Sequence, residues 1–175
     1  MELVIIVGHE QSKSGAYNKT YNVNEFSYNE KLALDISNCL SIEHTVKYRD
    51  RYKDLPFEVN ELEPDYIVSL HCNAFNTKAS GTEMLYYINS VKGKNMAKVF
   101  QTNIVKALNL PDRGIKGKCL EDRGGYLLKY TNAPCIICES FFIDNDSDFE
   151  IAKARYNELI AMYVKSIYDV RNLIN

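Results

Sequence analysis

Short, uninterrupted apolar runs alternate along this chain with longer segments whose apolar residues recur at helical spacing. The clearest run is Leu3–Val7, in which no polar residue interrupts five apolar ones. A run of this kind is typical of a strand buried on both faces, as in a parallel sheet covered by helices. By this pattern we predict strands at Leu3–Val7, Thr45–Tyr48, Asp65–Leu70, Gly81–Ile88, Tyr126–Tyr130 and Cys135–Cys138.

The segments between these runs favour helices. In the first of them, Leu32, Ala33 and Ile36 share one face. Strands that alternate with helices predict an α/β fold with a mainly parallel, twisted sheet flanked by helices on both faces. The 175 residues contain no repeat or linker, so we expect one domain over residues 1–175. The predicted helices are Glu25–Leu40, Leu55–Leu62, Met96–Leu108 and Asp146–Leu173.

Charge and composition exclude several classes of function. A net charge of −2 argues against nucleic acid as a partner, because such proteins usually carry a basic surface. No run approaches the roughly 18 apolar residues that a membrane span needs. The N-terminal run is short and follows the acidic Glu2, so it predicts a strand rather than a signal peptide, and we expect synthesis in the cytoplasm.

Five cysteines are an odd number, which disfavours a disulfide framework. Cys135 and Cys138 have the spacing of a redox or metal pair. However, they lie in an apolar run without a second such pair, so we interpret them as buried strand residues.

Three candidate functional residues directly follow predicted strands: His9, His71 and Glu139. Ligands of open α/β sheets bind outside the carboxyl ends of the strands, so these side chains are expected to converge. Each has a simpler interpretation, since an isolated histidine after a strand is more often a surface or capping residue. The third histidine, His44, is expected to be structural.

A hydrolytic zinc site needs about three protein ligands and one open position. Two histidines and a carboxylate would supply them. Glu25 begins the first predicted helix, where the helix dipole alone would also favour a carboxylate. Glu30 is the competitor, pointing about 140° away around a helix of 3.6 residues per turn. The residues alone leave this choice open.

In their order and spacing, several segments resemble the zinc-dependent N-acetylmuramoyl-L-alanine amidases (amidase type 3) of bacterial autolysins and phage endolysins. The resemblance covers nearly the whole chain. It rests on VGH at residues 7–9, Glu25 with Leu32 and Ala33, SLHCN at 69–73, GTEMLYY at 81–87, RGIK at 113–116, LLKYTNAP at 127–134 and ESFFIDN at 139–145.

The resemblance implies a ligand set and a reaction. The family's ligand glutamate precedes a Leu-Ala pair by seven residues, which selects Glu25. His9, Glu25 and His71 are then the ligands of Zn2+, and Glu139 is the catalytic glutamate. The implied reaction is hydrolysis of the amide between N-acetylmuramic acid and L-alanine in bacterial peptidoglycan. Glu10 and Phe141 stand where the family usually has glycine, which affects the expected peptide preference.

Two other functions remain as alternatives. A zinc peptidase acting on peptidoglycan stem peptides would use the same kinds of ligand, and a wall-binding module without activity would use none. Without a signal peptide, a phage endolysin that reaches the wall after release is the expected context, and a C-terminal wall-binding domain absent from this chain is possible. Arg113, Lys116 and Arg123 suit peptide carboxylates, although solvated loop charges are the simpler interpretation.

Overall fold

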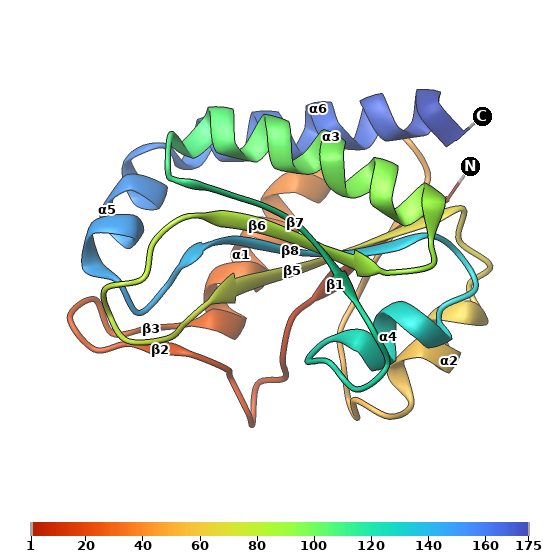
Figure 1. Cartoon of the computed structure of the whole chain (residues 1–175), viewed down its shortest axis with the longest axis horizontal. Helices are drawn as coiled ribbons and strands as arrows, with labels where there is room; N and C mark the ends of the chain where they lie inside the picture. The colour runs from red at the N-terminus through yellow and green to blue at the C-terminus, as the bar shows by residue number, and fades with distance from the viewer. Residues whose placement is uncertain (1, 175) are drawn as a thin grey trace.

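The computed structural model describes residues 2–174 as a six-stranded sheet with helices on both faces (Figure 1). The strands pair in parallel except β6 with β8, which are antiparallel. The predicted α/β fold with a mainly parallel sheet is therefore confirmed. In sheet order the strands are β4 (His44–Lys47), β1 (Leu3–Val7), β5 (Tyr66–Asn73), β8 (Cys135–Phe142), β6 (Thr82–Tyr87) and β7 (Asp112–Lys118).

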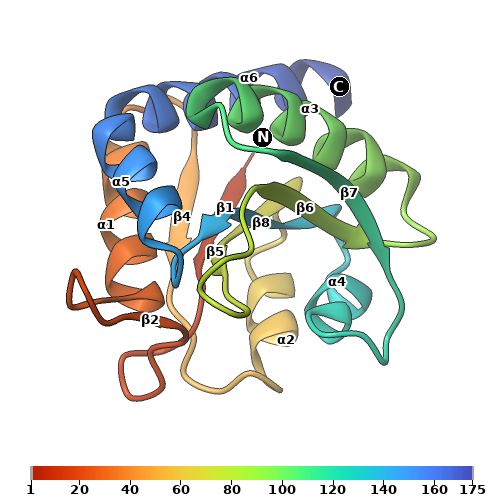
Figure 2. The same ribbon diagram turned by 60° about the vertical axis from the view of Figure 1, so that its left-hand side comes forward.

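Two hydrophobic cores cover the two faces of this sheet. Because side chains alternate along a strand, Leu3, Ile5 and Val7 enter one core while Val4 and Ile6 enter the other. Figure 2 shows α3 and α6 lying along one face and α2 and α4 on the other. The larger core packs against α1 (Glu25–Asn38), α3 (Val91–Leu108), α5 (Asp146–Ala154) and α6 (Tyr156–Ile174), and the smaller one against α2 (Leu55–Asn60) and α4 (Gly125–Tyr130).

The structure corrects two predicted elements. The segment Tyr126–Tyr130, predicted as a strand, belongs to helix α4. Gly124 at φ 83° turns the chain into this helix, and the adjacent Leu127 and Leu128 both reach the smaller core. The predicted helix Asp146–Leu173 is two helices, because Arg155 leaves helical geometry and donates from its guanidinium to the Ala107 carbonyl at 3.0 Å.

Further elements have no counterpart among the predictions. Strand β7 lies at the sheet edge and is mostly polar, and β2 (Tyr17–Asn18) and β3 (Val23–Asn24) form a small hairpin before α1. Among residues 2–174, no helix combines the length and apolar character that a bilayer crossing requires.

Candidate metal centre

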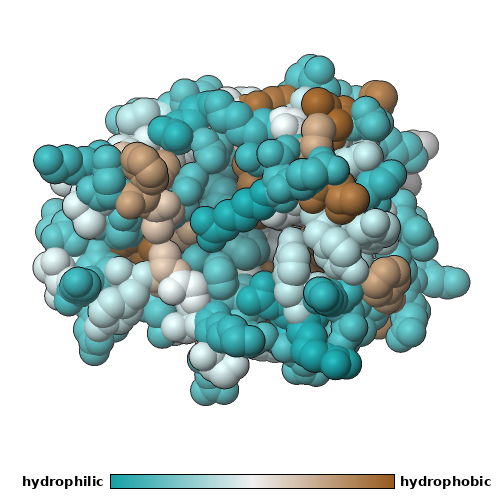
Figure 3. Space-filling model, turned by 60° about the horizontal axis from the view of Figure 1, so that its bottom comes forward, coloured by the Kyte–Doolittle hydropathy of each residue, from teal (hydrophilic) through white to brown (hydrophobic). Residues whose placement is uncertain are grey.

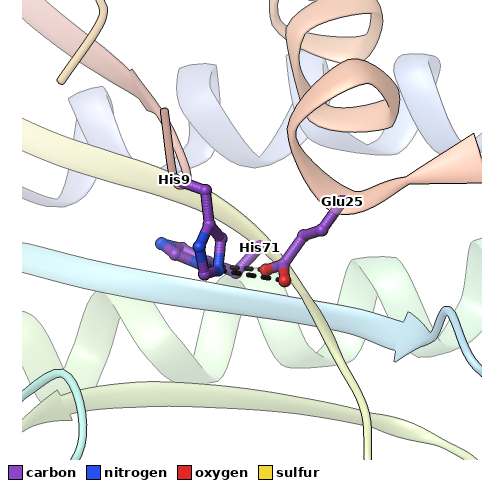
Figure 4. A group of neighbouring side chains, drawn as sticks. All are labelled: His9, Glu25 and His71. Atoms are coloured by element: carbon purple, nitrogen blue, oxygen red, sulfur yellow. Dashed lines mark hydrogen bonds and ion pairs between the residues drawn. The ribbon is translucent and has the colours of Figure 1, made fainter. Parts of the chain in front are cut away.

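Three of the predicted site residues meet at the carboxyl end of β1 (Figure 4). His9 Nε2 lies 3.0 Å from Glu25 Oε2, and His71 Nδ1 lies 3.0 Å from Glu25 Oε1. One ligand atom from each residue falls within 4.8 Å of the other two. His9 follows β1, Glu25 is the first residue of α1, and His71 lies on β5.

Glu25 reaches this point from the first turn of α1, which packs in the larger core on one face of the sheet. Pairing of β1 with β5 ends at Leu70, so the Cys72 N–H has no strand partner there. Glu25 Oε1 accepts that N–H at 3.0 Å, and Oε2 accepts the Ala16 N–H at 3.1 Å. The Glu25 side chain is fully buried, and its carboxylate contacts three segments of the chain, at His9, at Ala16 and at residues 71–72.

The charge on Glu25 is favoured by its neighbours. Burial would raise the pKa of its carboxyl, but hydrogen bonds with His71 and His9 outweigh burial and hold this pKa well below the usual range. Burial lowers the pKa of His71, which favours the neutral imidazole that a metal binds. Glu30, the competing glutamate, lies outside this cluster and near Tyr48, where its charge adds to burial in raising the pKa of the Tyr48 hydroxyl.

Two glycines make room for the cluster. A Cβ on Gly8 would lie 2.7 Å from His71 Cε1, and one on Gly15 would lie 2.5 Å from Glu25 Oε2. His9 itself has φ 67°, a left-handed conformation uncommon outside glycine and frequent at functional sites. Neither glycine was chosen as a site residue from sequence, although Gly8 belongs to the VGH segment at residues 7–9.

Glu139 faces the same region from β8, directly across from His71 in the parallel register. Both lie inside their strands rather than after them, because pairing extends to Asn73 and Phe142. Burial, followed by the charge of Glu25, raises the pKa of Glu139 to about 8. Its Oε2 is buried and has no hydrogen-bond partner among the described residues.

A cavity of about 440 Å³ opens over the centre on the side of α2 and α4. Figure 3 shows a mainly hydrophilic face of the molecule with a hollow near its middle. His9, His71 and Glu139 line the cavity, whereas Glu25 lies beneath them. Its other walls include Arg49, Tyr52, Glu83, Leu85, Lys118, Arg123, Tyr126 and Leu127.

The three cations proposed from sequence are placed differently. Arg123 lines the cavity. Arg113 Nε instead donates to Glu83 Oε2 at 2.9 Å, and Lys116 is exposed on β7 away from the cavity lining. His44 packs between Ser37 Oγ and the Ile42 carbonyl, each at 2.7 Å, as expected of a structural residue.

The arrangement fits a divalent metal. Two imidazoles and one carboxylate are the donors of many hydrolytic zinc sites, which keep a further position open. The open cavity beside the cluster offers room for a substrate, and a glutamate whose pKa lies near neutral pH is suited to proton transfer.

Comparison with known proteins agrees with this description. Residues 3–169 match the family model described as N-acetylmuramoyl-L-alanine amidase. An N-acetylmuramoyl-L-alanine amidase of Clostridium difficile 630 superposes with TM-score 0.84 at 26% identity, covering 98% of this chain and 96% of that one. The catalytic domain of an endolysin targeting Clostridia difficile gives 0.83 at 27% identity, covering 97% of each chain.

Curated relatives match over shorter shares of their own length. The Bacillus subtilis amidase LytC is 24% identical over 90% of this chain but only 32% of LytC. An uncharacterised cell wall amidase of Bacillus anthracis is 34% identical over 48% of this chain and 16% of that protein. The chain thus spans less than half the length of these curated relatives.

Proposed function

Because the chain belongs to the N-acetylmuramoyl-L-alanine amidase family, we propose that it hydrolyses the amide between N-acetylmuramic acid and L-alanine in bacterial peptidoglycan. His9, Glu25 and His71 would hold a zinc ion. The observation that carries the proposal is the cluster of three ligand atoms within 4.8 Å, at the edge of a cavity that Glu139 also lines.

Each residue has a distinct task in this reaction. A zinc ion held by these three residues would supply Lewis acidity toward the amide carbonyl and the attacking water. The Glu139 carboxylate accepts a proton from that water and delivers it to the amide nitrogen, so that the stem peptide leaves as a neutral amine. Glu25 holds the ring of His71 by its hydrogen bond at Nδ1 in the metal-free protein.

Defined muropeptides test the proposal. Incubation with purified protein should release a peptide with a free L-alanine amino terminus and leave the lactyl-muramic sugar, both identified by mass. A chelator should stop the reaction and added zinc restore it. Cleavage within the stem peptide would instead identify a zinc peptidase, and binding to sacculi without any product would identify a wall-binding module.

We also propose that the chain is the catalytic part of a phage endolysin. Support comes from its similarity to the endolysin catalytic domain over 97% of each chain. The gene should then lie in a phage or prophage genome beside genes for membrane pore formation. A chromosomal gene outside any prophage would contradict this context and leave the amidase proposal standing.

A further inference from the structure

Arg49 is a buried cation whose place the metal cluster does not explain. It follows β4, and only 13% of its side chain is exposed. The side chain lines the cavity with His9 and His71. Its Nε is buried and has no hydrogen-bond partner among residues 2–174. Burying such a donor without an acceptor is costly, so a site of this kind is suited to a ligand that supplies one.

No carboxylate among the described residues lies within hydrogen-bond distance of the Arg49 Nε. Its ion pair with Glu10 joins Nε and Oε2 at 3.9 Å, which exceeds hydrogen-bond distance. Glu10 is held instead by Lys13 at 3.2 Å and Ser12 at 3.0 Å. The guanidinium carbon of Arg49 lies 5.4 Å from the ring centroid of Tyr52, which positions its plane without using its donors.

The charges around the cavity indicate which part of the substrate faces Arg49. Lys118 and Arg123 also line it. Of its acidic residues besides Glu139, Glu83 is already engaged by Arg113 and Asn73, and Asp122 accepts the Cys119 N–H at 2.7 Å. In peptidoglycan the muramic sugar is uncharged, because its lactyl carboxyl is consumed in the scissile amide. The stem peptide, in contrast, carries carboxylates. A buried arginine beside the metal centre therefore matches the peptide side of the substrate.

We propose that Arg49 is a substrate-binding residue that binds the free carboxylate of the stem-peptide residue following L-alanine. This inference rests on the proposed amidase function and deepens it. A guanidinium binds a carboxylate through two parallel N–H donors, and L-alanine is short enough to place the next residue's carboxylate near the metal centre. The protein would then distinguish peptidoglycan with a free acid at this position from peptidoglycan in which that acid is amidated.

Two muropeptides that differ only at this group, carboxylate or carboxamide, test the inference. For the zinc-loaded wild type, kcat/KM should be about ten- to a hundredfold higher on the carboxylate, the range expected for hydrogen bonds to a charged group. Arg49→Gln should bring the ratio close to one, chiefly by lowering kcat/KM on the carboxylate substrate. Arg49→Lys, which keeps the charge without the paired donors, should give an intermediate ratio.

Arg51→Gln is the matched control. Arg51 is two residues away, but it is 83% exposed, pairs with Asp54 at 2.6 Å and lies outside the cavity lining. It should keep the wild-type ratio, and circular dichroism should show all variants folded.

The outcomes separate this inference from the proposed function. Equal cleavage of both substrates by the wild type would overturn the role of Arg49 and leave the amidase function intact. If Arg49→Gln keeps the wild-type ratio of kcat/KM values, whether both activities fall equally or neither falls, the role of Arg49 is overturned as well. If the wild type cleaves neither substrate, the proposed function itself is wrong and the inference falls with it.

Discussion

Glu139 has an environment in which a cation bound nearby would change its protonation. It is buried on β8, and the charges of Glu25 and Glu83 add to burial in raising its pKa to about 8. In the metal-free protein the carboxyl is therefore mainly protonated at pH 7. A divalent cation in the neighbouring cluster favours the carboxylate, which is the form that can accept a proton.

Replacing Glu139 with glutamine separates chemistry from metal binding. The amide keeps the size of the side chain but cannot accept a proton from water, so kcat should fall by roughly 10²- to 10⁴-fold. Zinc content should match that of the wild type, because Glu139 lies outside the ligand cluster. Steady-state rates and metal analysis of the same preparation check both points. Near-normal turnover would remove Glu139 from the reaction.

The raised pKa of Glu139 also predicts how metal-free stability depends on pH. The carboxyl ionises near 4.5 when exposed and near 8 when folded. The folded state therefore holds an extra proton between these values. This contribution to stability is complete below pH 4.5 and is lost as pH rises through 8. Urea unfolding of Glu139→Gln and of metal-free wild type measures this effect. The free energy of unfolding of the variant minus that of the wild type should rise by a few kcal/mol from pH 5 to pH 9. A constant difference across this range would contradict the assignment.

The position of Gly15 leaves no room for a side chain beside the proposed metal ligands. Its φ is 78°, and a Cβ there would lie 2.5 Å from Glu25 Oε2 and 2.7 Å from His9 Cδ2. Gly15→Ala should therefore weaken zinc affinity at least about tenfold, the size of effects from residues supporting metal ligands. Gly114→Ala is the matched control, because Gly114 has φ 75° but no atom within 4 Å of the Cβ position. Calorimetric zinc titration should show loss only for Gly15→Ala.

At the scale of elements, α1 determines which glutamate joins the cluster of His9 and His71. The Asn24 side chain caps α1 by accepting the Ser27 N–H, which fixes Glu25 as its first residue. Glu25 then reaches past β1, while Glu30 contacts Tyr48. We expect Glu25→Gln to lose most bound zinc and Glu30→Gln to retain it, as measured by metal analysis after dialysis. The reverse result would exchange their roles.

Predictions from sequence succeed where one local pattern determines an element. The unbroken apolar run Leu3–Val7 is sufficient for β1, and the face shared by Leu32, Ala33 and Ile36 is sufficient for α1. The run Tyr126–Tyr130 is too short to distinguish strand from helix, and the smaller core decides in favour of α4. The break at Arg155 depends on the Ala107 carbonyl of another helix, which no local pattern contains.

In the candidate site, too, some residues could be selected from sequence and others could not. His9 and His71 could be selected because each follows an apolar run, and the family pattern selected Glu25. Arg49 and Gly15 could not, because their significance appears only in the folded chain: Arg49 lines the cavity with His71 and Glu139, and Gly15 lies against the Glu25 carboxylate.

At the scale of the whole molecule, metal binding should stabilise the fold. The proposed ligands at residues 9, 25 and 71 meet only when α1, β1 and β5 are assembled, so an unfolded chain has no equivalent site. Zinc at a hundred times its dissociation constant should add about 2.7 kcal/mol. This corresponds to a rise of roughly 5–10 °C in Tm for a chain of this size. Thermal melts of wild type should show the rise, and His71→Ala should show little. An unchanged wild-type Tm would contradict a metal site of this kind.

The position of β8 has a consequence for the chain during translation. β8 is the last strand in sequence, yet it lies between β5 and β6 in the middle of the sheet. A nascent chain therefore contains His9, Glu25 and His71 long before the central strand that carries Glu139 leaves the ribosome. Glu139 and the strand that completes the sheet are therefore synthesised together and late, so under the proposed function ribosome-bound fragments ending before residue 135 should be devoid of wall-degrading activity.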